Sequence, residues 1–148
     1  MITGIYNANV DEKGRFLLPS RMRSQLQSQE LYVLPGLDEN HLMLMTPEYF
    51  EDQFSAAVLD SPTAMFDRRK RSLIRRLIAP AQEITLDSAG RLNIPSSMRE
   101  KYGINNKSEI MLVGTGFYVE VWNAATYEEA MAEDTESLAD IAENLVED

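Results

Sequence analysis

The sequence contains no cysteine and only one histidine, and both shortages exclude classes of site. Without cysteine there is no disulfide framework, no thiolate metal site and no cysteine nucleophile, and a reducing compartment is expected. The lone His41 excludes a two-histidine metal motif, and its place in the loop of residues 37–41 predicts a surface position. No glycine-rich phosphate-binding loop is present either. These absences favour a binding protein over an enzyme, with no cofactor, no metal and no small-molecule substrate.

Long apolar runs are also missing. No run approaches the roughly 20 residues that a membrane span requires, and residues 1–10 lack the basic start and apolar stretch of a signal peptide. The 148 residues are 44% hydrophobic, which is ordinary for a globular protein. We therefore expect a soluble cytoplasmic protein with no membrane partner.

Basic residues are absent from the C-terminal segment. Residues 128–148 hold nine of the 24 acidic residues and no lysine or arginine, so 15 acidic residues remain beside 14 basic ones in residues 1–127. The formal charge of -10 therefore belongs to the tail, and the near-neutral body does not exclude DNA as a partner. Three roles stay open for the tail: competition with DNA for basic surface, protein interaction in a scaffold or antitoxin-like module, and solubility.

What the sequence does contain is an internal repeat at an offset of 76 residues. Seven of the thirteen positions from residue 11 to residue 23 are identical to their counterparts in residues 87–99. The shared residues are Asp11, Gly14, Arg15, Pro19, Ser20, Met22 and Arg23, matched by Asp87, Gly90, Arg91, Pro95, Ser96, Met98 and Arg99. So many identities in so short a stretch indicate a duplicated unit.

Each copy is predicted to fold as a hairpin, a short helix and a second hairpin. Aspartate at the first position and glycine at the fourth suit a type I turn, and a strand begins at the arginine that follows. Proline then ends the strand and opens a helix. The predicted turns are residues 11–14 and 87–90, the helices residues 20–27 and 96–102, and the second turns residues 35–36 and 114–116. We expect the two copies to interlock into one barrel, because neither has enough core alone.

A helical insert is predicted between the copies. Thr46-Pro47 and Ser61-Pro62 suit helix starts, which predicts helices over residues 47–59 and 62–78. The second helix has an apolar stripe, formed by Phe66, Leu73, Ile74, Leu77 and Ile78, and an opposite basic face, formed by Arg68, Arg69, Arg71, Arg75 and Arg76. This basic face fits DNA phosphates, acidic side chains of a neighbouring subunit, or plain solvation.

The paired segments Asp11-Glu12-Lys13-Gly14-Arg15 and Asp87-Ser88-Ala89-Gly90-Arg91, each leading to a proline and a further arginine, resemble the signature of the MraZ family. The resemblance covers roughly residues 1–127 and includes Trp122. It implies an α+β fold: a double-repeat swapped-hairpin β-barrel like that of AbrB-type regulators, with a helical insert and a C-terminal helix. The corresponding divisions are residues 1–46 and 81–127 for the two repeats, 47–80 for the insert and 128–148 for the acidic helix or tail.

The resemblance also implies a function. Members bind double-stranded DNA as ring-shaped homo-oligomers, recognise short direct repeats in the promoter of the bacterial division and cell-wall gene cluster, and act mostly as repressors. A nucleoid-associated location follows. Two departures from the pattern are the second turn, where Ser88-Ala89 replaces Glu12-Lys13 and removes a cation, and the acidic tail, which extends beyond the matched part.

The candidate DNA-binding residues lie at the repeated turns. By the resemblance, the Asp-x-x-x-Arg element contacts DNA, which maps onto Asp11 with Arg15 and onto Asp87 with Arg91. Three further cations are expected to join the same patch: Lys13, Arg21 and Arg23. Two alternatives remain. In the first, each arginine merely pairs with its own turn aspartate and fixes the hairpin. In the second, the two equivalent aspartates form an acid-base pair, which would need a deep pocket lined by both.

Overall fold

The computed structural model describes residues 1–147; Asp148, the end of the predicted acidic tail, lies outside the described residues. The described strands form one six-stranded and one two-stranded antiparallel sheet, the larger with the order β1-β7-β8-β4-β3-β5 and the smaller pairing β2 with β6. The strands are β1 (Ile2–Asn9), β2 (Arg15–Leu17), β3 (Glu30–Pro35), β4 (Leu42–Met45), β5 (Gln82–Thr85), β6 (Arg91–Asn93), β7 (Glu109–Gly116) and β8 (Val119–Asn123).

Strands of the two sequence repeats pair with each other. β1 pairs with β7, β2 with β6, β3 with β5 and β4 with β8, so four ladders join the first half to the second. The interlocking of the halves is therefore present. The order of the larger sheet is open at β1 and β5, so the described strands do not show the closed barrel expected from the sequence.

The main core lies where the sheets and two short helices meet. Phe16 of β2 and Leu92 of β6 are opposite each other and almost fully buried, because alternate residues of a strand point to the same face. Helices α1 (Ser20–Leu26) and α5 (Ser96–Lys101) begin directly after Pro19 and Pro95, near the positions predicted. Each repeat therefore contributes an equivalent strand and helix to one shared core.

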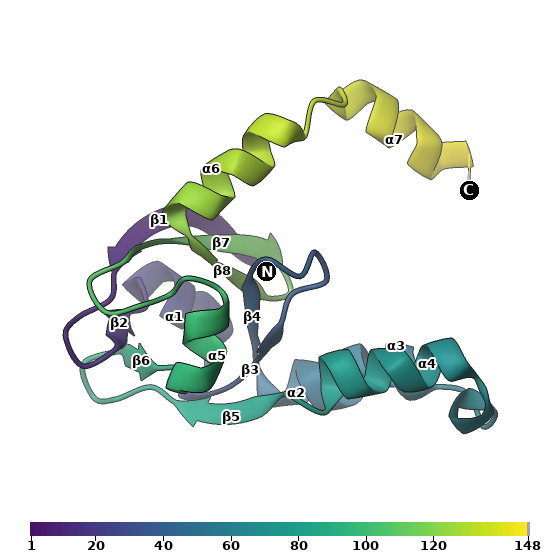
Figure 1. The fold of residues 1–148 in the computed structure, drawn as a ribbon, viewed down its shortest axis with the longest axis horizontal. Helices are drawn as coiled ribbons and strands as arrows, with labels where there is room; N and C mark the ends of the chain where they lie inside the picture. Colours follow the sequence, from purple (N-terminus) through teal and green to yellow (C-terminus); the bar gives the residue numbers. More distant parts are fainter. Residues whose placement is uncertain (148) are drawn as a thin grey trace.

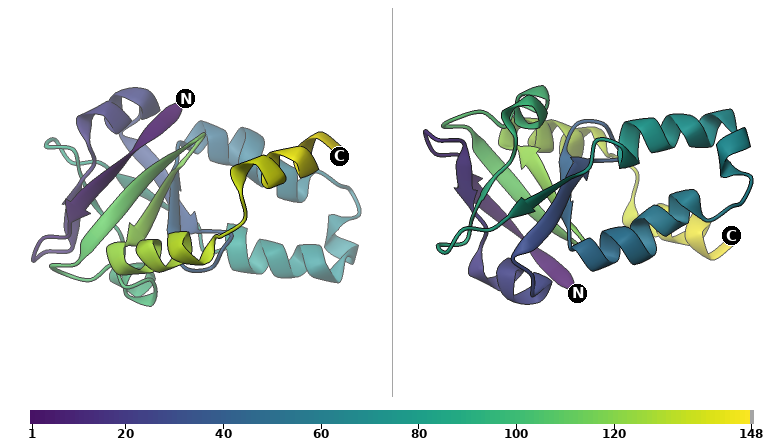
Figure 2. Two further views of the ribbon diagram at one scale, coloured as in Figure 1. Left: turned by 90° about the horizontal axis from the view of Figure 1, so that it is seen from above. Right: turned by 90° about the horizontal axis from the view of Figure 1, so that it is seen from below.

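The helical insert projects as a hairpin of two helical stretches from the side opposite β2 and β6 (Figures 1 and 2). The first stretch is capped as predicted, with Thr46 Oγ1 accepting the backbone N–H of Tyr49 at 3.2 Å. A second core joins the insert to the other face of β3 and β4 through Phe50, Leu77 and Met45. The segments are α2 (Pro47–Tyr49), the π-helix η1 (Phe50–Phe54), α3 (Ser55–Leu59), the 3-10 helix η2 (Ala64–Phe66), α4 (Arg68–Leu73) and the π-helix η3 (Ile74–Ile78).

Two predictions for the second stretch were wrong. Its α-helix begins at Arg68 and is capped by Asp67, whose Oδ1 accepts the N–H groups of Arg69 and Lys70, whereas the Ser61-Pro62 pair forms only a local turn. Phe66 does not join the apolar stripe, because it lies in the preceding 3-10 helix with 78% of its surface exposed.

The C-terminal segment contains two helices where one was predicted. Asn123 caps α6 (Ala124–Glu133) by accepting the N–H groups of Ala125 and Thr126, as expected from the sequence. The helix ends at Glu133, and Ser137 then caps a separate helix, α7 (Leu138–Glu147), by accepting the N–H of Asp140. Figure 1 shows the two helices as an arm that leaves the sheet beside β7 and β8.

Candidate nucleic-acid interface

The first repeated turn holds its arginine through one aspartate. Gly14 N–H donates to the carbonyl of Asp11 at 3.0 Å, which closes the predicted turn. Oδ1 of Asp11 accepts the backbone N–H groups of Lys13 and Arg15, at 2.9 and 2.8 Å. The guanidinium Nε of Arg15 donates to Oδ2 of the same carboxylate at 2.9 Å. One side chain thus fixes both the turn and the direction of the arginine.

The second turn repeats this geometry. Oδ1 of Asp87 accepts the N–H groups of Ala89 and Arg91, each at 2.9 Å, and Oδ2 accepts Nε of Arg91 at 2.9 Å. The replacement of Glu12-Lys13 by Ser88-Ala89 leaves the turn unchanged, because the bonds from residue 89 and from the arginine backbone use main-chain atoms.

The ion pair of each turn uses only one edge of the guanidinium. Within residues 1–147, the terminal nitrogens of Arg15 and Arg91 donate no hydrogen bond, and the two side chains are 28% and 38% exposed. A guanidinium held at Nε keeps its two terminal amino groups available for a planar acceptor pair, with little rotamer freedom to lose. The bond to aspartate and a contact with DNA are therefore compatible.

Both turn arginines lie on the exposed face of the β2–β6 ribbon. Arg15 is opposite Asn93 and Arg91 is opposite Leu17, so these four side chains share the face that points away from buried Phe16 and Leu92. The two arginines form a diagonal pair, which ladder geometry places about 7–8 Å apart. Figure 1 shows this ribbon at the end of the molecule away from the insert.

Each turn packs against an arginine from the helix of the other repeat. A Cβ on Gly14 would lie 2.5 Å from Nη2 of Arg99, and a Cβ on Gly90 would lie 2.5 Å from Nη1 of Arg23. Each of these arginines also donates Nε to a carbonyl of its own repeat, Arg23 to Leu18 at 3.0 Å and Arg99 to Ile94 at 2.7 Å. The helix arginine of each half therefore lies beneath the turn of the other half.

These contacts distinguish the cations that were predicted to join the DNA-binding patch. Arg23 is half-buried, with its guanidinium beneath Gly90, so its position suits a structural role. Lys13 and Arg21 are exposed, as a DNA contact requires. Lys107, which was not singled out from the sequence, lies beside the first turn, with Nζ 3.6 Å from Glu12 Oε1. No sequence signal near Lys107 reveals this, since the turn is far away along the chain.

The pKa of each turn carboxyl lies below its ordinary value. For Asp11 the main cause is the hydrogen bond from the backbone N–H of Arg15; desolvation opposes it, and the Arg15 side chain lowers the pKa further. Arg91 acts in the same way on the pKa of Asp87. Both carboxylates are therefore ionised at neutral pH, and they hold the arginines rather than act as an acid-base pair.

The prediction that His41 is a surface residue was wrong. It is 1% exposed, it stacks on Trp122 with ring centroids 4.3 Å apart, and its Nε2 lies 3.2 Å from Oε2 of Glu120. The loop brings the imidazole back over β8, where an aromatic ring and a carboxylate can satisfy it. Burial raises the pKa of Glu120, but hydrogen bonds from His41 and Trp122 outweigh it, so the net pKa lies below the ordinary value.

Three potential metal-ligand atoms lie at this cluster. Atoms of Asp38, His41 and Glu120 lie within 4.8 Å of one another. Both imidazole nitrogens already have partners, because Nδ1 lies 3.0 Å from Asn40 Oδ1 and Nε2 contacts Glu120. The hydrogen bonds explain the arrangement without an ion. The cluster also lies on β8 and on the loop between β3 and β4, not on the β2–β6 ribbon.

The basic face of the insert does not join the turn arginines. Arg68, Arg69, Arg75 and Arg76 are exposed on the projecting hairpin, and Arg76 is paired with Glu39 of the loop between β3 and β4. Arg71 instead donates to the carbonyl of Met65 at 2.7 Å. The molecule thus has two separate basic surfaces, at opposite ends in Figure 1. No helix within residues 1–147 combines the length and apolar character that a membrane crossing needs.

Fold and site together define a class of protein: a tandem-repeat α+β chain whose halves complete each other's sheets and present paired turn arginines on a short ribbon. Comparison with known proteins gives the family. Residues 1–71 and 77–148 match the family model described as "MraZ protein, putative antitoxin-like". The chain belongs to the MraZ family.

Relatives from three bacteria support this assignment along nearly the whole chain. The chain is similar to the transcriptional regulator MraZ of Treponema denticola, with 34% identity covering 99% of this chain and 98% of the relative. Identity to the protein of that name in Treponema pallidum subsp. pallidum is 35%, covering 94% and 95% of the two chains. For the Mesoplasma florum protein it is 30%, covering 96% and 93%. All three carry the name of a regulator and not of an enzyme.

Proposed function

We propose that the protein is a sequence-specific, double-stranded DNA-binding transcriptional regulator that contacts DNA through Arg15 and Arg91. The observation that carries the proposal is the exposed face of the β2–β6 ribbon, where both arginines are held at Nε and keep their terminal nitrogens available. The names of the relatives support regulation of transcription.

The shape of the ribbon suits a groove of DNA. The major groove of B-DNA admits a two-stranded β-ribbon, and an arginine fork fits the O6 and N7 acceptors of guanine. Leu17 and Asn93, which share the face, offer an apolar contact for a thymine methyl group and a polar contact for a base edge. Lys13, Arg21 and Lys107 supply cations for phosphates around it.

The finer expectations from the resemblance belong to this proposal. The protein would assemble into a ring, bind short direct repeats in the promoter of the division and cell-wall gene cluster, repress it, and associate with the nucleoid. Because both halves complete their sheets within one chain, every subunit would present one ribbon, and several ribbons would engage several repeats with the gain of avidity. The swapped-hairpin barrel is the corresponding proposal for the fold.

Selection of bound duplexes from random DNA, followed by affinity measurements on variants, tests the proposal. Arg15→Ala and Arg91→Ala should each weaken binding to the selected duplex by about 1–3 kcal/mol if the arginine reads a base edge, or lower the salt slope by about 1 if it meets a phosphate. Arg68→Ala is the matched control, because it removes the same charge from the insert.

Equal affinities of the wild type and both turn variants, with all proteins folded, would contradict the proposal. A loss that is equal for the turn variants and for Arg68→Ala would reduce the interaction to general charge attraction and would remove the role of the ribbon in specificity.

A further inference from the structure

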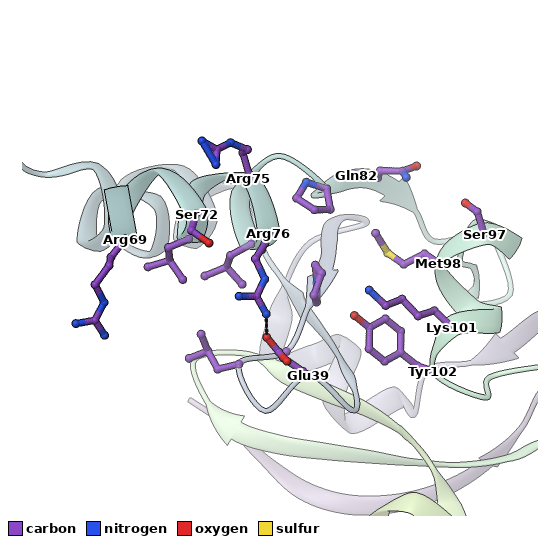
Figure 3. Close-up of a pocket in the computed structure, with 16 residues that line it drawn as sticks. Glu39, Arg69, Ser72, Arg75, Arg76, Gln82, Ser97, Met98, Lys101 and Tyr102 are labelled. Atoms are coloured by element: carbon purple, nitrogen blue, oxygen red, sulfur yellow. Dashed lines mark hydrogen bonds and ion pairs between the residues drawn. The ribbon is translucent and has the colours of Figure 1, made fainter. Parts of the chain in front are cut away.

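The two ends of the β2–β6 ribbon are supported differently, because the connectors that follow the two short helices differ in length. Residues 27–29 join α1 to β3, whereas residues 102–108 join α5 to β7. The longer connector starts at Tyr102, which lines a groove between α5 and the insert (Figure 3). From there it reaches the first turn, residues 11–14, of the other repeat.

The longer connector holds the start of the first turn by main-chain bonds. Lys107 N–H donates to the carbonyl of Val10 at 2.8 Å, and Val10 N–H donates to the carbonyl of Ser108 at 2.9 Å. Lys107 has a positive φ of 67°, which is uncommon for a residue with a Cβ and turns the chain at this point. The residue that leads into the first turn therefore has both main-chain polar groups bonded to the other repeat.

Asn106 of the same connector reaches the tip of the first turn. Its Nδ2 donates to the carbonyl of Glu12 at 2.9 Å, and its Oδ1 accepts Nη1 of Arg99 at 3.4 Å. Arg99 is buried beneath Gly14, and the same Nη1 also donates to the carbonyl of Ile104 at 3.2 Å. One side-chain amide thus joins the tip of the turn to the buried arginine beneath it.

The second turn keeps only part of this support. Its leading residue, Leu86, donates its N–H to the carbonyl of Gln29 at 2.7 Å, as Val10 does to Ser108. The return bond that Lys107 supplies at the first turn has no counterpart within residues 1–147. The shorter connector therefore holds the start of the second turn by one main-chain bond instead of two.

The tip of the second turn has no bond to a connector. Ser88 is the counterpart of Glu12, and among the described residues no hydrogen bond reaches the carbonyl of Ser88. The bond from Leu18 N–H to the carbonyl of Gly90, at 3.0 Å, holds the base of the turn. A hollow of about 300 Å³ lies between this turn and residues 27–29. The second turn is thus open on the side where the first is held.

The charge of the two tips differs as well. Lys13 and Lys107 lie at the first tip together with Glu12, whereas the second tip has the uncharged pair Ser88-Ala89. Contacts with phosphates fix the register of a protein on DNA. The held turn is therefore also the turn with cations that can fix its place on the DNA backbone.

We propose that Asn106 is a positioning residue for DNA recognition: it holds the first turn so that Arg15 makes the more discriminating of the two arginine contacts. An arginine on a held turn loses little freedom on binding and cannot follow a base edge that is displaced. Arg91, on the turn with an open tip, can adapt and therefore discriminates less. The ribbon then has one preferred orientation along DNA, although both ends carry the same motif. This inference rests on the proposed contact of both arginines with DNA.

The first test needs no DNA. Hydrogen exchange, corrected for intrinsic rates, should be slower at Lys13 and Gly14 than at Ala89 and Gly90, because local opening is rarer where the tip is held. Asn106→Ala should accelerate exchange at the first turn by about two- to tenfold, the usual contribution of one hydrogen bond, and leave the second turn unchanged. Equal protection of the two turns in the wild type would overturn the inference.

The matched control is the neighbouring asparagine. Asn105 is exposed, and within residues 1–147 only its main chain forms hydrogen bonds, both with Ser108. Asn105→Ala removes the same amide from the same connector but keeps the bond to Glu12, so the first turn should exchange as in the wild type. Equal acceleration by Asn105→Ala and Asn106→Ala would indicate a general loosening of the connector and would remove the role of the Asn106 contact.

The second test measures discrimination between bases. Single base-pair changes in the selected duplex identify the position that each turn arginine reads, since Arg15→Ala or Arg91→Ala no longer distinguishes bases there. In the wild type, the ratio of affinities should be larger at the Arg15 position. Asn106→Ala should lower that ratio by about two- to tenfold and leave the ratio at the Arg91 position unchanged. A merely structural defect lowers binding to every duplex by the same factor and leaves both ratios intact.

Asn106→Asp separates the donor from the acceptor. Aspartate keeps an acceptor for Arg99 but cannot donate to the carbonyl of Glu12, so the ratio at the Arg15 position should fall as in Asn106→Ala. The added negative charge weakens binding to all duplexes alike and cancels in the ratio. A wild-type ratio in either variant would overturn the positioning role. Arg15→Ala is measured in the same series, and its failure to change affinity would instead refute the DNA proposal itself.

Discussion

At the scale of single residues, Gly14 and Gly90 connect the sequence repeat to the interlocked structure. Each has a positive φ, of 81° and 85°, and each leaves room for an arginine of the other repeat. The shared glycine of the motif is thus required twice, by the backbone of its turn and by the guanidinium beneath it.

Gly14→Ala should therefore lower the free energy of unfolding. Backbone strain at positive φ costs roughly 1–2 kcal/mol for a residue with a Cβ, and displacement of buried Arg99 adds to it. Urea denaturation measures the loss. Gly116→Ala is the control, because Gly116 also has a positive φ, of 103°, but no atom lies within 4 Å of the added Cβ. An equal loss in both variants would remove the packing part of this explanation.

The pair of buried His41 and half-buried Glu120 predicts a pH dependence. Because the pKa of Glu120 is lower in the folded protein than the ordinary 4.5, its stabilising contribution is fully present above that value and is lost as the pH falls through the folded pKa. The wild type should therefore exceed Glu120→Gln in unfolding free energy near neutral pH, and the difference should shrink in acid. Urea titrations at several pH values measure it; a difference independent of pH would contradict the assignment.

Turn residues were predictable, whereas this pair was not. The turn formed by Asp11 and Arg15 is predictable because it depends only on residues within four positions of each other. The same residues recur in the second copy, which strengthens the prediction. His41 occurs once and follows polar loop residues, so its local context indicates the surface. Its burial depends on Glu120 and Trp122 of another repeat, and no local pattern encodes that contact.

At the scale of elements, the insert depends on the cap at Asp67. Asp67→Ala should cost about 0.5–2 kcal/mol, because the first-turn N–H groups of Arg69 and Lys70 lose their acceptor. Hydrogen exchange at these two amides should accelerate most. Ser61→Ala is the control, since among the described residues the side chain of Ser61 bonds only to Thr63, in a local turn. Faster exchange in the control than in Asp67→Ala would restore the helix start first predicted from the sequence.

Helix starts were predicted well where one cap was available and poorly where two competed. Thr46 and Asn123 have no rival nearby, and both act as caps. Ser61-Pro62 and Asp67 are both good signals that the sequence does not rank, and in the structure only Asp67 caps the α-helix. The tail was also mispredicted. Ser137 caps a second helix there, but the surrounding acidic residues suggested one helix that continues into the tail.

At the scale of the whole molecule, the protomer leaves large apolar side chains uncovered. They include Leu37, Met65, Phe66, Phe117, Leu138 and Leu145, each at least 60% exposed. Exposed apolar surface of this kind marks sites of association. Light scattering at micromolar concentration should therefore give a mass several times 16.8 kDa, and a constant monomer mass across that range would refute self-assembly.

The internal repeat predicted that the two halves pair with each other. It did not predict that β1 and β5 remain at the edges of an open sheet. Equivalent segments must bury equivalent apolar faces, so β2 with β6 and their helices form one core. Whether β1 and β5 meet depends on the accumulated twist and tilt of six strands, which the alternation of side chains does not determine.

The strand pairing also sets an order of events during synthesis. β1 leaves the ribosome well before its partner, β7, which is made only after both repeated turns, the insert and α5. Until then β1 is an unpaired edge on a nascent chain, open to pairing with other chains. The positive φ of Gly4 and the polar Thr3, Asn7 and Asn9 weaken β1 as a template for such premature pairing. A duplicated chain whose first strand pairs with a strand of the second copy thus cannot complete its larger sheet until both copies have been translated.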